Sequence, residues 1–216
     1  MSDSTLDRIG GGILAAGAAM STIGYVLGSI DEPGRQITPA YVGTPLYTTF
    51  NLLQFFGAGL ILVGLPVLVS SHWRRSPVLV LLGATGVGLV MLIQGVGNAF
   101  VNATIFPALV DAPATRALAN SPAPSLMGLL FLVGMVGWIV GGPRLGIAVL
   151  RAKVVHRWIG VVMLVGTLAG LASFVLPQHF ESLGAIVECF ALAAIGAELL
   201  LPTSPARVPL VSAAAA

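Results

Sequence analysis

Residues 47–69 read YTTFNLLQFFGAGLILVGLPVLV, a run of 23 residues without a charged side chain. A bilayer core about 30 Å thick is crossed by about 20 apolar residues in a helix. A strand of a membrane barrel would need only about 10 residues of alternating polarity, and this run is longer and does not alternate. It therefore predicts a transmembrane helix.

Five further runs in the 216-residue chain come close to the same criterion, so we expect an all-α polytopic membrane protein, a bundle of six transmembrane helices. The expected spans are 9–30, 47–69, 78–102, 125–142, 156–176 and 181–201. We expect them to form a single transmembrane domain over 1–202, followed by a short disordered tail over 203–216. The first run exceeds the apolar part of a signal peptide and follows a single arginine, Arg8, so we expect it to be retained.

Composition excludes several other classes of protein. Hydrophobic residues make up 56% of the chain and charged residues 8%, against about 25% charged residues in soluble domains. A soluble enzyme and a disordered chain are therefore excluded. The ten basic residues are too scattered for a phosphate-binding stripe, so no nucleic-acid partner is expected. The single cysteine, Cys189, cannot form an intrachain disulfide.

The basic residues fall mainly on one side of the predicted topology. With a cytoplasmic N-terminus, only Arg35 and Arg116 lie outside, and the other eight of the ten lie inside. The inside residues are Arg8, Arg74, Arg75, Arg144, Arg151, Lys153, Arg157 and Arg207. Cytoplasmic loops carry an excess of Lys and Arg, so both termini are expected to be cytoplasmic.

Polar side chains within the spans are the candidate functional residues, because polar groups are costly in hydrocarbon. In the predicted topology they all lie in the outer half of the membrane, and the spacing of 94, 98 and 102 places those amides on one helix face. Two interpretations follow: an outward-facing polar pocket for a ligand, or amides that only join helices. The candidate ligand-binding residues are Asn51, Gln54, Gln94, Asn98, Asn102 and Glu188.

Glu188 is the strongest single candidate, since an isolated carboxylate at that depth must be paired, hydrated or protonated. A protonated acid could act as a catalyst or proton carrier. The alternative is a neutral acid that is hydrogen-bonded to an amide such as Gln94 or Asn98. His179, in the outer hairpin, is a further candidate at the mouth of the pocket.

The other two histidines lie beside tryptophans at cytoplasmic helix ends, where interfacial anchoring is the ordinary role. They are His72 next to Trp73, and His156 near Trp158. No clustering of Cys or His indicates a zinc or haem site, so no metal or cofactor is expected.

Small residues recur at intervals of four, as in Gly11 and Ala15 and in Gly166 and Gly170. This spacing predicts close helix packing, within the chain, in a homodimer or against another membrane protein. The glycine-rich string at 83–88 lies inside a span with no preceding strand, which excludes a nucleotide loop. Pro66 is expected to kink the second span and to free a carbonyl near its cytoplasmic end.

The layout resembles a large group of small bacterial polytopic membrane proteins that is known as a domain of unknown function. The shared features are Arg8-Ile9-Gly10 at the first helix, Arg151-Ala152-Lys153, the segment His156-Arg157-Trp158-Ile159-Gly160, and a last helix with Glu188. The resemblance implies a bacterial inner (plasma) membrane and brings no activity.

Three functions are compatible with these patterns. The leading expectation is a protein that binds a small amphipathic or apolar molecule in the outward-facing polar pocket, with membrane lipid around it. The first alternative is a membrane enzyme that acts on an isoprenoid-like apolar substrate, with Glu188 as the acid. The second alternative is an accessory or structural subunit of a membrane complex.

Overall fold

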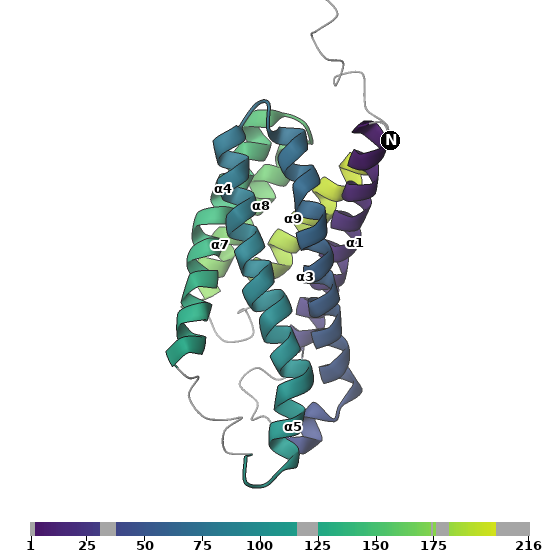
Figure 1. Ribbon diagram of the computed structural model, residues 1–216. Helices are drawn as coiled ribbons and strands as arrows, with labels where there is room; N and C mark the ends of the chain where they lie inside the picture. Colours follow the sequence, from purple (N-terminus) through teal and green to yellow (C-terminus); the bar gives the residue numbers. More distant parts are fainter. Residues whose placement is uncertain (1–2, 31–37, 116–124, 174, 176–181, 202–216) are drawn as a thin grey trace, which may run out of the picture.

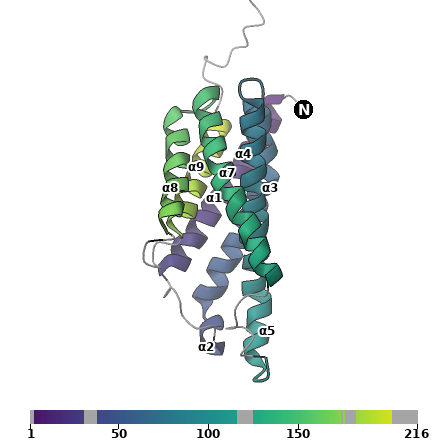
Figure 2. The ribbon, with the colours of Figure 1, turned by 90° about the vertical axis from the view of Figure 1, so that its left-hand side faces the viewer.

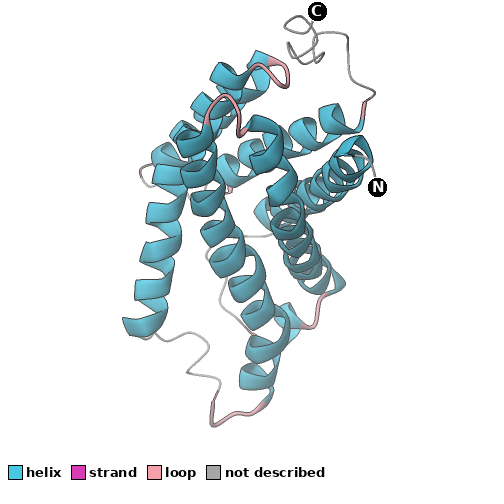
Figure 3. Ribbon diagram, turned by 45° about the horizontal axis from the view of Figure 1, so that its top comes forward, coloured by secondary structure: helices cyan, strands magenta, loops and turns pink. Residues whose placement is uncertain are grey.

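The computed structural model describes residues 3–30, 38–115, 125–173, 175 and 182–201, and within these residues all regular structure is helical (Figures 1 and 3). The elements in chain order are α1 (Asp3–Ile30), α2 (Pro39–Val42), α3 (Pro45–His72), α4 (Pro77–Val90), η1 (Met91–Asn98), η2 (Val101–Ile105), α5 (Phe106–Asp111), α7 (Ser125–Ala152), α8 (Arg157–Ser173) and α9 (Leu183–Leu200).

Five helical stretches are long and apolar enough to cross a membrane, which gives the chain the form of a multi-pass membrane protein. They are Thr5–Ile30, Pro45–His72, Pro77–Asp111, Leu129–Ala152 and Leu183–Leu200. The expected span at 156–176 corresponds to α8, an apolar helix of 17 residues that is shorter than these five. The expected tail at 203–216 and His179 lie outside the described residues.

Two of the expected span boundaries are wrong. The fourth span does not end at Gly142, because α7 continues through Pro143 to Ala152. The third does not end at Asn102 and runs on to Asp111, with Pro107 in the first turn of α5. Proline is tolerated at a first helical turn, and within membrane helices other groups satisfy the carbonyl that it frees. Next to Pro143, the Arg144 guanidinium donates to the Val140 carbonyl oxygen at 2.9 Å.

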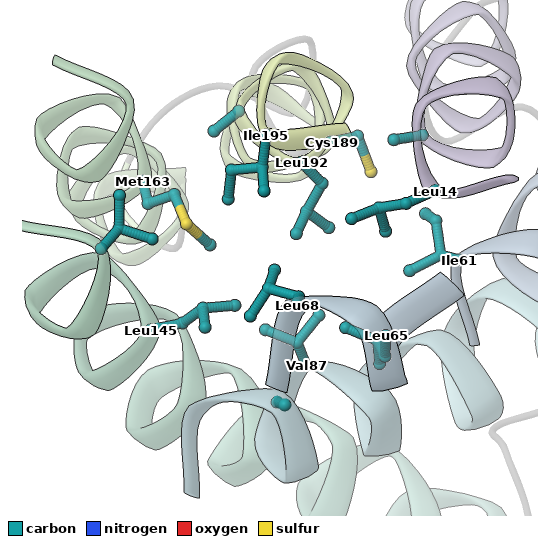
Figure 4. Packing of buried hydrophobic residues seen from close by; sticks show 14 of the residues in the cluster. Leu14, Ile61, Leu65, Leu68, Val87, Leu145, Met163, Cys189, Leu192 and Ile195 are labelled. Atoms are coloured by element: carbon teal, nitrogen blue, oxygen red, sulfur yellow. The ribbon is translucent and has the colours of Figure 1, made fainter. Parts of the chain in front are cut away.

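The long helices form a closed ring. Each packs against the next along the chain, counting α4 to α5 as one, and α9 returns to α1. Figure 2 shows the α8 and α9 side of this ring opposite the α3 and α4 side. Aliphatic side chains from all six helices fill the middle (Figure 4), including Leu14, Leu68, Val87, Leu145, Met163 and Leu192. The centre of the ring is therefore an apolar core.

One end of the ring carries most of the positive charge. The start of α1, the α3–α4 turn and the α7–α8 turn all lie at the top in Figure 1, whereas α2 and α5 lie at the bottom. We call the top the basic end; its residues are Arg8, Arg74, Arg75, Arg144, Arg151, Lys153 and Arg157.

Glycines allow the backbones to approach closely at most seams of the ring. A Cβ on Gly17 of α1 would lie 2.7 Å from the Gly57 carbonyl oxygen of α3, and one on Gly86 of α4 would lie 2.5 Å from Cα of Gly141 in α7. The remaining pairs are Gly146 with Gly160, Gly184 with Gly170, and Gly196 with Gly11. The predicted role of Gly11, Gly166 and Gly170 in helix packing is confirmed, and their contacts lie within the chain.

Candidate functional site

The third span changes its helical form where its amides lie. After the α-helical α4, the chain continues as two π-helical segments: η1, which holds Gln94 and Asn98, and η2, which holds Asn102. Each hydrogen bond in a π-helix spans five residues, and this form is rare and frequent at functional sites. The polar part of the third span is therefore also its least regular part.

Asn51 of α3 lies on the helix face that contacts this π-helical region. On that face, the Tyr47 hydroxyl donates to the Asn102 carbonyl oxygen at 2.9 Å, and the rings of Phe55 and Phe100 have centroids 6.3 Å apart. Asn51 lies four residues from both Tyr47 and Phe55, and residues at this spacing share one helix face.

The Asn51 side chain is fully buried and only half satisfied. Its exposed fraction is 0%, and its Nδ2 donates to the Tyr47 carbonyl oxygen at 2.9 Å. Its carboxamide oxygen has no hydrogen-bond partner among the described residues. An unpaired buried acceptor costs about 1–3 kcal/mol and calls for an explanation.

The other amides face different neighbours. Gln54 lies against α1, where a Cβ on Gly24 would be 2.9 Å from its Cγ. Gln94 lies against α7, where its Nε2 would be 3.4 Å from a Cβ on Gly134. Asn98 is exposed. Asn51 and Gln54 are about 60° apart around α3, enough to place them in seams with different helices.

Glu188 is enclosed by α7, α8 and α9. Its carboxyl Oε1 lies 2.6 Å from the Thr167 hydroxyl, and 4% of the residue is exposed. A Cβ on Gly142 would lie 2.6 Å from Oε1, and one on Gly166 would lie 2.7 Å from Cγ of Glu188. Its hydrogen-bond partner among the described residues is Thr167, rather than Gln94 or Asn98. The structure therefore separates Glu188 from the amides in its hydrogen bonding.

The single proton of the Thr167 hydroxyl limits which hydrogen bonds can form around Glu188. This oxygen is 2.6 Å from the Glu188 carboxyl and 3.2 Å from the Met163 carbonyl oxygen, and it carries one proton to donate. If Glu188 is a neutral acid, it donates to Thr167, which then donates to Met163. Both contacts are then hydrogen bonds and no charge is buried, which low-polarity surroundings favour.

One histidine differs from its expected role. His72 is 0% exposed, and its Nδ1 lies 3.0 Å from the Leu68 carbonyl oxygen, so the prediction of an interfacial anchor is wrong for this residue. His156 is exposed, and its Nδ1 forms a hydrogen bond with the Glu198 carboxylate at 2.6 Å. Glu198 also accepts the backbone N–H of His156 at 2.8 Å, where α8 begins.

Sequence reasoning missed Thr167 and Tyr47, which contact Glu188 and Asn102, and Trp138, which packs between helices. A threonine or tyrosine can satisfy its hydroxyl locally, so its presence in a span gives little signal. Trp138 lies against Gly170 of α8 and Gly184 of α9, and its position depends on those glycines. No group of three His, Cys, Asp or Glu in the described part of the chain could hold a metal ion.

Comparison with known protein families, with characterised proteins and with solved structures gives no match to this chain. The resemblance noted in the sequence thus adds no residue roles. The geometry of the chain's own residues carries the functional argument.

Proposed function

We propose that this chain is a six-span inner-membrane protein that binds a small amphipathic molecule in the outer half of the bilayer, between α3 and the π-helical part of the third span. Both termini are cytoplasmic in this proposal. The 17 residues of α8 give a helix about 26 Å long, close to the hydrocarbon thickness of about 30 Å. The concentration of Arg and Lys at the basic end favours the cytoplasmic side for that end.

The observation that carries the binding function is the unpaired carboxamide oxygen of Asn51. A fully buried acceptor that finds no donor among the described residues favours a partner that comes from outside the chain. That partner must supply a hydroxyl or an N–H group, because the unpaired carboxamide oxygen of Asn51 is an acceptor. Gln94 and Asn102 are half-buried and Asn98 is exposed, so the polar row on the third span is accessible from the lipid side.

Replacement of Asn51 by Leu tests the binding function. Small molecules are extracted from gently purified protein and identified by mass spectrometry, for the unmodified chain and for Asn51→Leu. Thr49→Leu, an exposed position on the same helix, is the matched control. We expect a compound bearing a hydroxyl or N–H group that both the unmodified chain and Thr49→Leu retain and Asn51→Leu loses.

Stability gives a second readout of the same variant. Removal of an unpaired buried acceptor leaves Asn51→Leu as stable as the parent or more so. If Asn51→Leu unfolds, the side chain has a structural partner; if it keeps the same compound, the site lies elsewhere. Either outcome would refute the proposal.

Orientation is tested by labelling from outside the cell. Single cysteines replace Arg74 at the basic end and Asp111 at the opposite end, in a Cys189→Ala background. A membrane-impermeant maleimide should label position 111 in intact cells and position 74 only after lysis. Labelling of position 74 in intact cells would reverse the proposed topology.

The enzyme alternative receives no support from the surroundings of Glu188. An acid catalyst must reach its substrate, and Glu188 is enclosed by Gly142, Gly166 and Thr167. Glu188 does not line either of the two apolar surface grooves beside α4. We therefore assign Glu188 to the packing of α7, α8 and α9.

A further inference from the structure

Two apolar grooves lie on either side of α4. The α3–α4 groove has a volume of about 460 Å³ and is lined by residues that include Leu62, Pro66, Val69, Trp73 and Leu81. The α4–α7 groove has a volume of about 370 Å³ and is lined by residues that include Leu82, Leu89, Leu132, Val136 and Val140. Ligand sites commonly measure about 300–1,000 Å³.

The two grooves form a pair because one helix separates them. Thr85 of α4 is exposed and lines both. The seams differ in how closely their helices approach: Gly88 meets only side-chain atoms of Leu65 and Leu62, at 3.5 Å and 3.8 Å, on the α3 side. The α3–α4 seam therefore lacks a glycine pair of the kind that closes the other seams, and it stays open along the lipid-facing side.

Arginines lie where both grooves approach the basic end. Arg74 follows Trp73, which lines the α3–α4 groove, and Arg74 is exposed. Arg144 lies one turn beyond Val140, which lines the α4–α7 groove, and donates to the Val140 carbonyl oxygen at 2.9 Å. Arg75, next to Arg74, donates to the Ala152 carbonyl oxygen at the end of α7.

We propose that a phospholipid with an anionic head group binds across α4, with one acyl chain in each groove and its phosphate between Arg74 and Arg144. Two separate apolar channels below a positively charged rim match the two chains and single charged head of such a lipid. A partner helix would fill one groove only and would bring apolar side chains against the arginines. Basic pockets between membrane helices are suited to anionic head groups. This site is independent of the one proposed around Asn51.

The head-group part of the proposal is tested by fluorescence quenching. Trp73 is 47% exposed in the rim of the α3–α4 groove, so bromine atoms on a bound acyl chain quench it. The protein, with Trp158→Phe to remove the other exposed tryptophan at this end, is reconstituted with brominated phosphatidylglycerol or brominated phosphatidylcholine. Each basic residue near the head group is expected to favour the anionic lipid roughly five-fold.

Variants of single arginines distinguish a specific head-group site from a general effect of the positive charge at the basic end. Arg74→Gln and Arg144→Gln should each lower the preference for phosphatidylglycerol roughly five-fold. Arg157→Gln, at the same end but at the start of α8, should leave it unchanged. Equal quenching by the two lipids in the parent, or an equal loss in all three variants, would overturn the head-group assignment.

The placement of the acyl chains is tested by blocking both grooves at Thr85, the residue that lines both of them. Thr85→Phe places a ring over both grooves at an exposed position, so the fold should persist while binding of the anionic lipid weakens at least five-fold. Val63→Phe, at an exposed position of α3 outside the groove lining, is the matched control. If Thr85→Phe and Val63→Phe have the same quenching curves, the chains do not lie beside α4 and the proposal fails.

Discussion

Replacement of Gly142 by Ala should destabilise the protein far more than the same replacement at Gly59. At Gly142, the new methyl group would lie 2.4 Å from the Thr167 hydroxyl oxygen and 2.6 Å from the Glu188 carboxyl oxygen. At Gly59, no atom lies within 4 Å of the position that a Cβ would occupy. Both positions are helical, so the gain of about 1 kcal/mol in helix propensity is common to both variants.

The magnitude follows from the contacts at Gly142. Ordinary contact begins at 3.4 Å, so α7 must move from α8 and α9 by about 1 Å, or the Thr167–Glu188 hydrogen bond must open. Overpacking of this kind costs about 1–3 kcal/mol. A hydrogen bond between membrane helices contributes about 0.6–1.7 kcal/mol. Gly142→Ala should therefore be less stable than Gly59→Ala by about 2–4 kcal/mol.

The assay is reversible unfolding in mixed micelles of a mild detergent and dodecyl sulfate, followed by far-ultraviolet circular dichroism. The free energy of unfolding of each variant is extrapolated to zero dodecyl sulfate. A second pair of proteins carries Thr167→Ala and Glu188→Ala, with and without Gly142→Ala. Because both clashing oxygens are then absent, the cost of Gly142→Ala should fall below about 1 kcal/mol.

Two results would refute this reasoning. One is a difference between Gly142→Ala and Gly59→Ala of less than about 0.5 kcal/mol, the scatter of ordinary surface substitutions. The other is a cost of Gly142→Ala that persists in full without the two oxygens. Either result would mean that Glu188 is not held between α7 and α8 as the distances indicate.

Three further predictions concern the same helices. Thr167→Val should lower the free energy of unfolding by about 1–3 kcal/mol because it leaves the carboxyl group unpaired, whereas Thr167→Ser should stay within about 0.5 kcal/mol of the parent in the same assay. Cys189 is 0% exposed, so a maleimide should modify it only after unfolding, as mass spectrometry of the intact protein would show; rapid modification of the folded protein would contradict its burial. Glu198→Gln should speed hydrogen exchange of the His156 N–H, which its carboxylate accepts just before α8 begins, and leave the last turn of α8 unchanged; an exchange rate at His156 equal to that of the parent would exclude this capping role.

Hydropathy predicted where the helices lie, since each expected span coincides with a helix for most of its length. It predicted some ends poorly, and the fourth span shows why. A Gly-Gly-Pro sequence is a stop signal in water, where a freed carbonyl is hydrated. In a membrane the same chain gains by remaining helical, because the open backbone groups have no water to bind. Pro143 therefore lies inside α7.

The glycine spacing predicted close packing without predicting the partners. Gly11 and Gly196 are separated by almost the whole chain, and they meet because the ring closes between α9 and α1. No local property of either residue encodes that closure. The same limit applies to the candidate site. The predicted topology gives the depth of each polar residue in the membrane, but it does not give the position of that residue around the ring. Gln94 accordingly lies against Gly134 of α7, whereas Glu188 lies between α7 and α8, beside Gly142 and Thr167.

The filled centre of the ring determines how a ligand can reach this protein. Leu68, Leu145 and Met163 are 0% exposed and meet in the middle, so the polar groups lie in the seams between helices instead of around a central channel. A water-soluble ligand would have to cross hydrocarbon to reach such a seam, at the cost of its hydration. A molecule already dissolved in the bilayer reaches the same seam from the side. Both proposed sites, at Asn51 and beside α4, therefore favour ligands that partition into the membrane, and neither requires the bundle to open at an end.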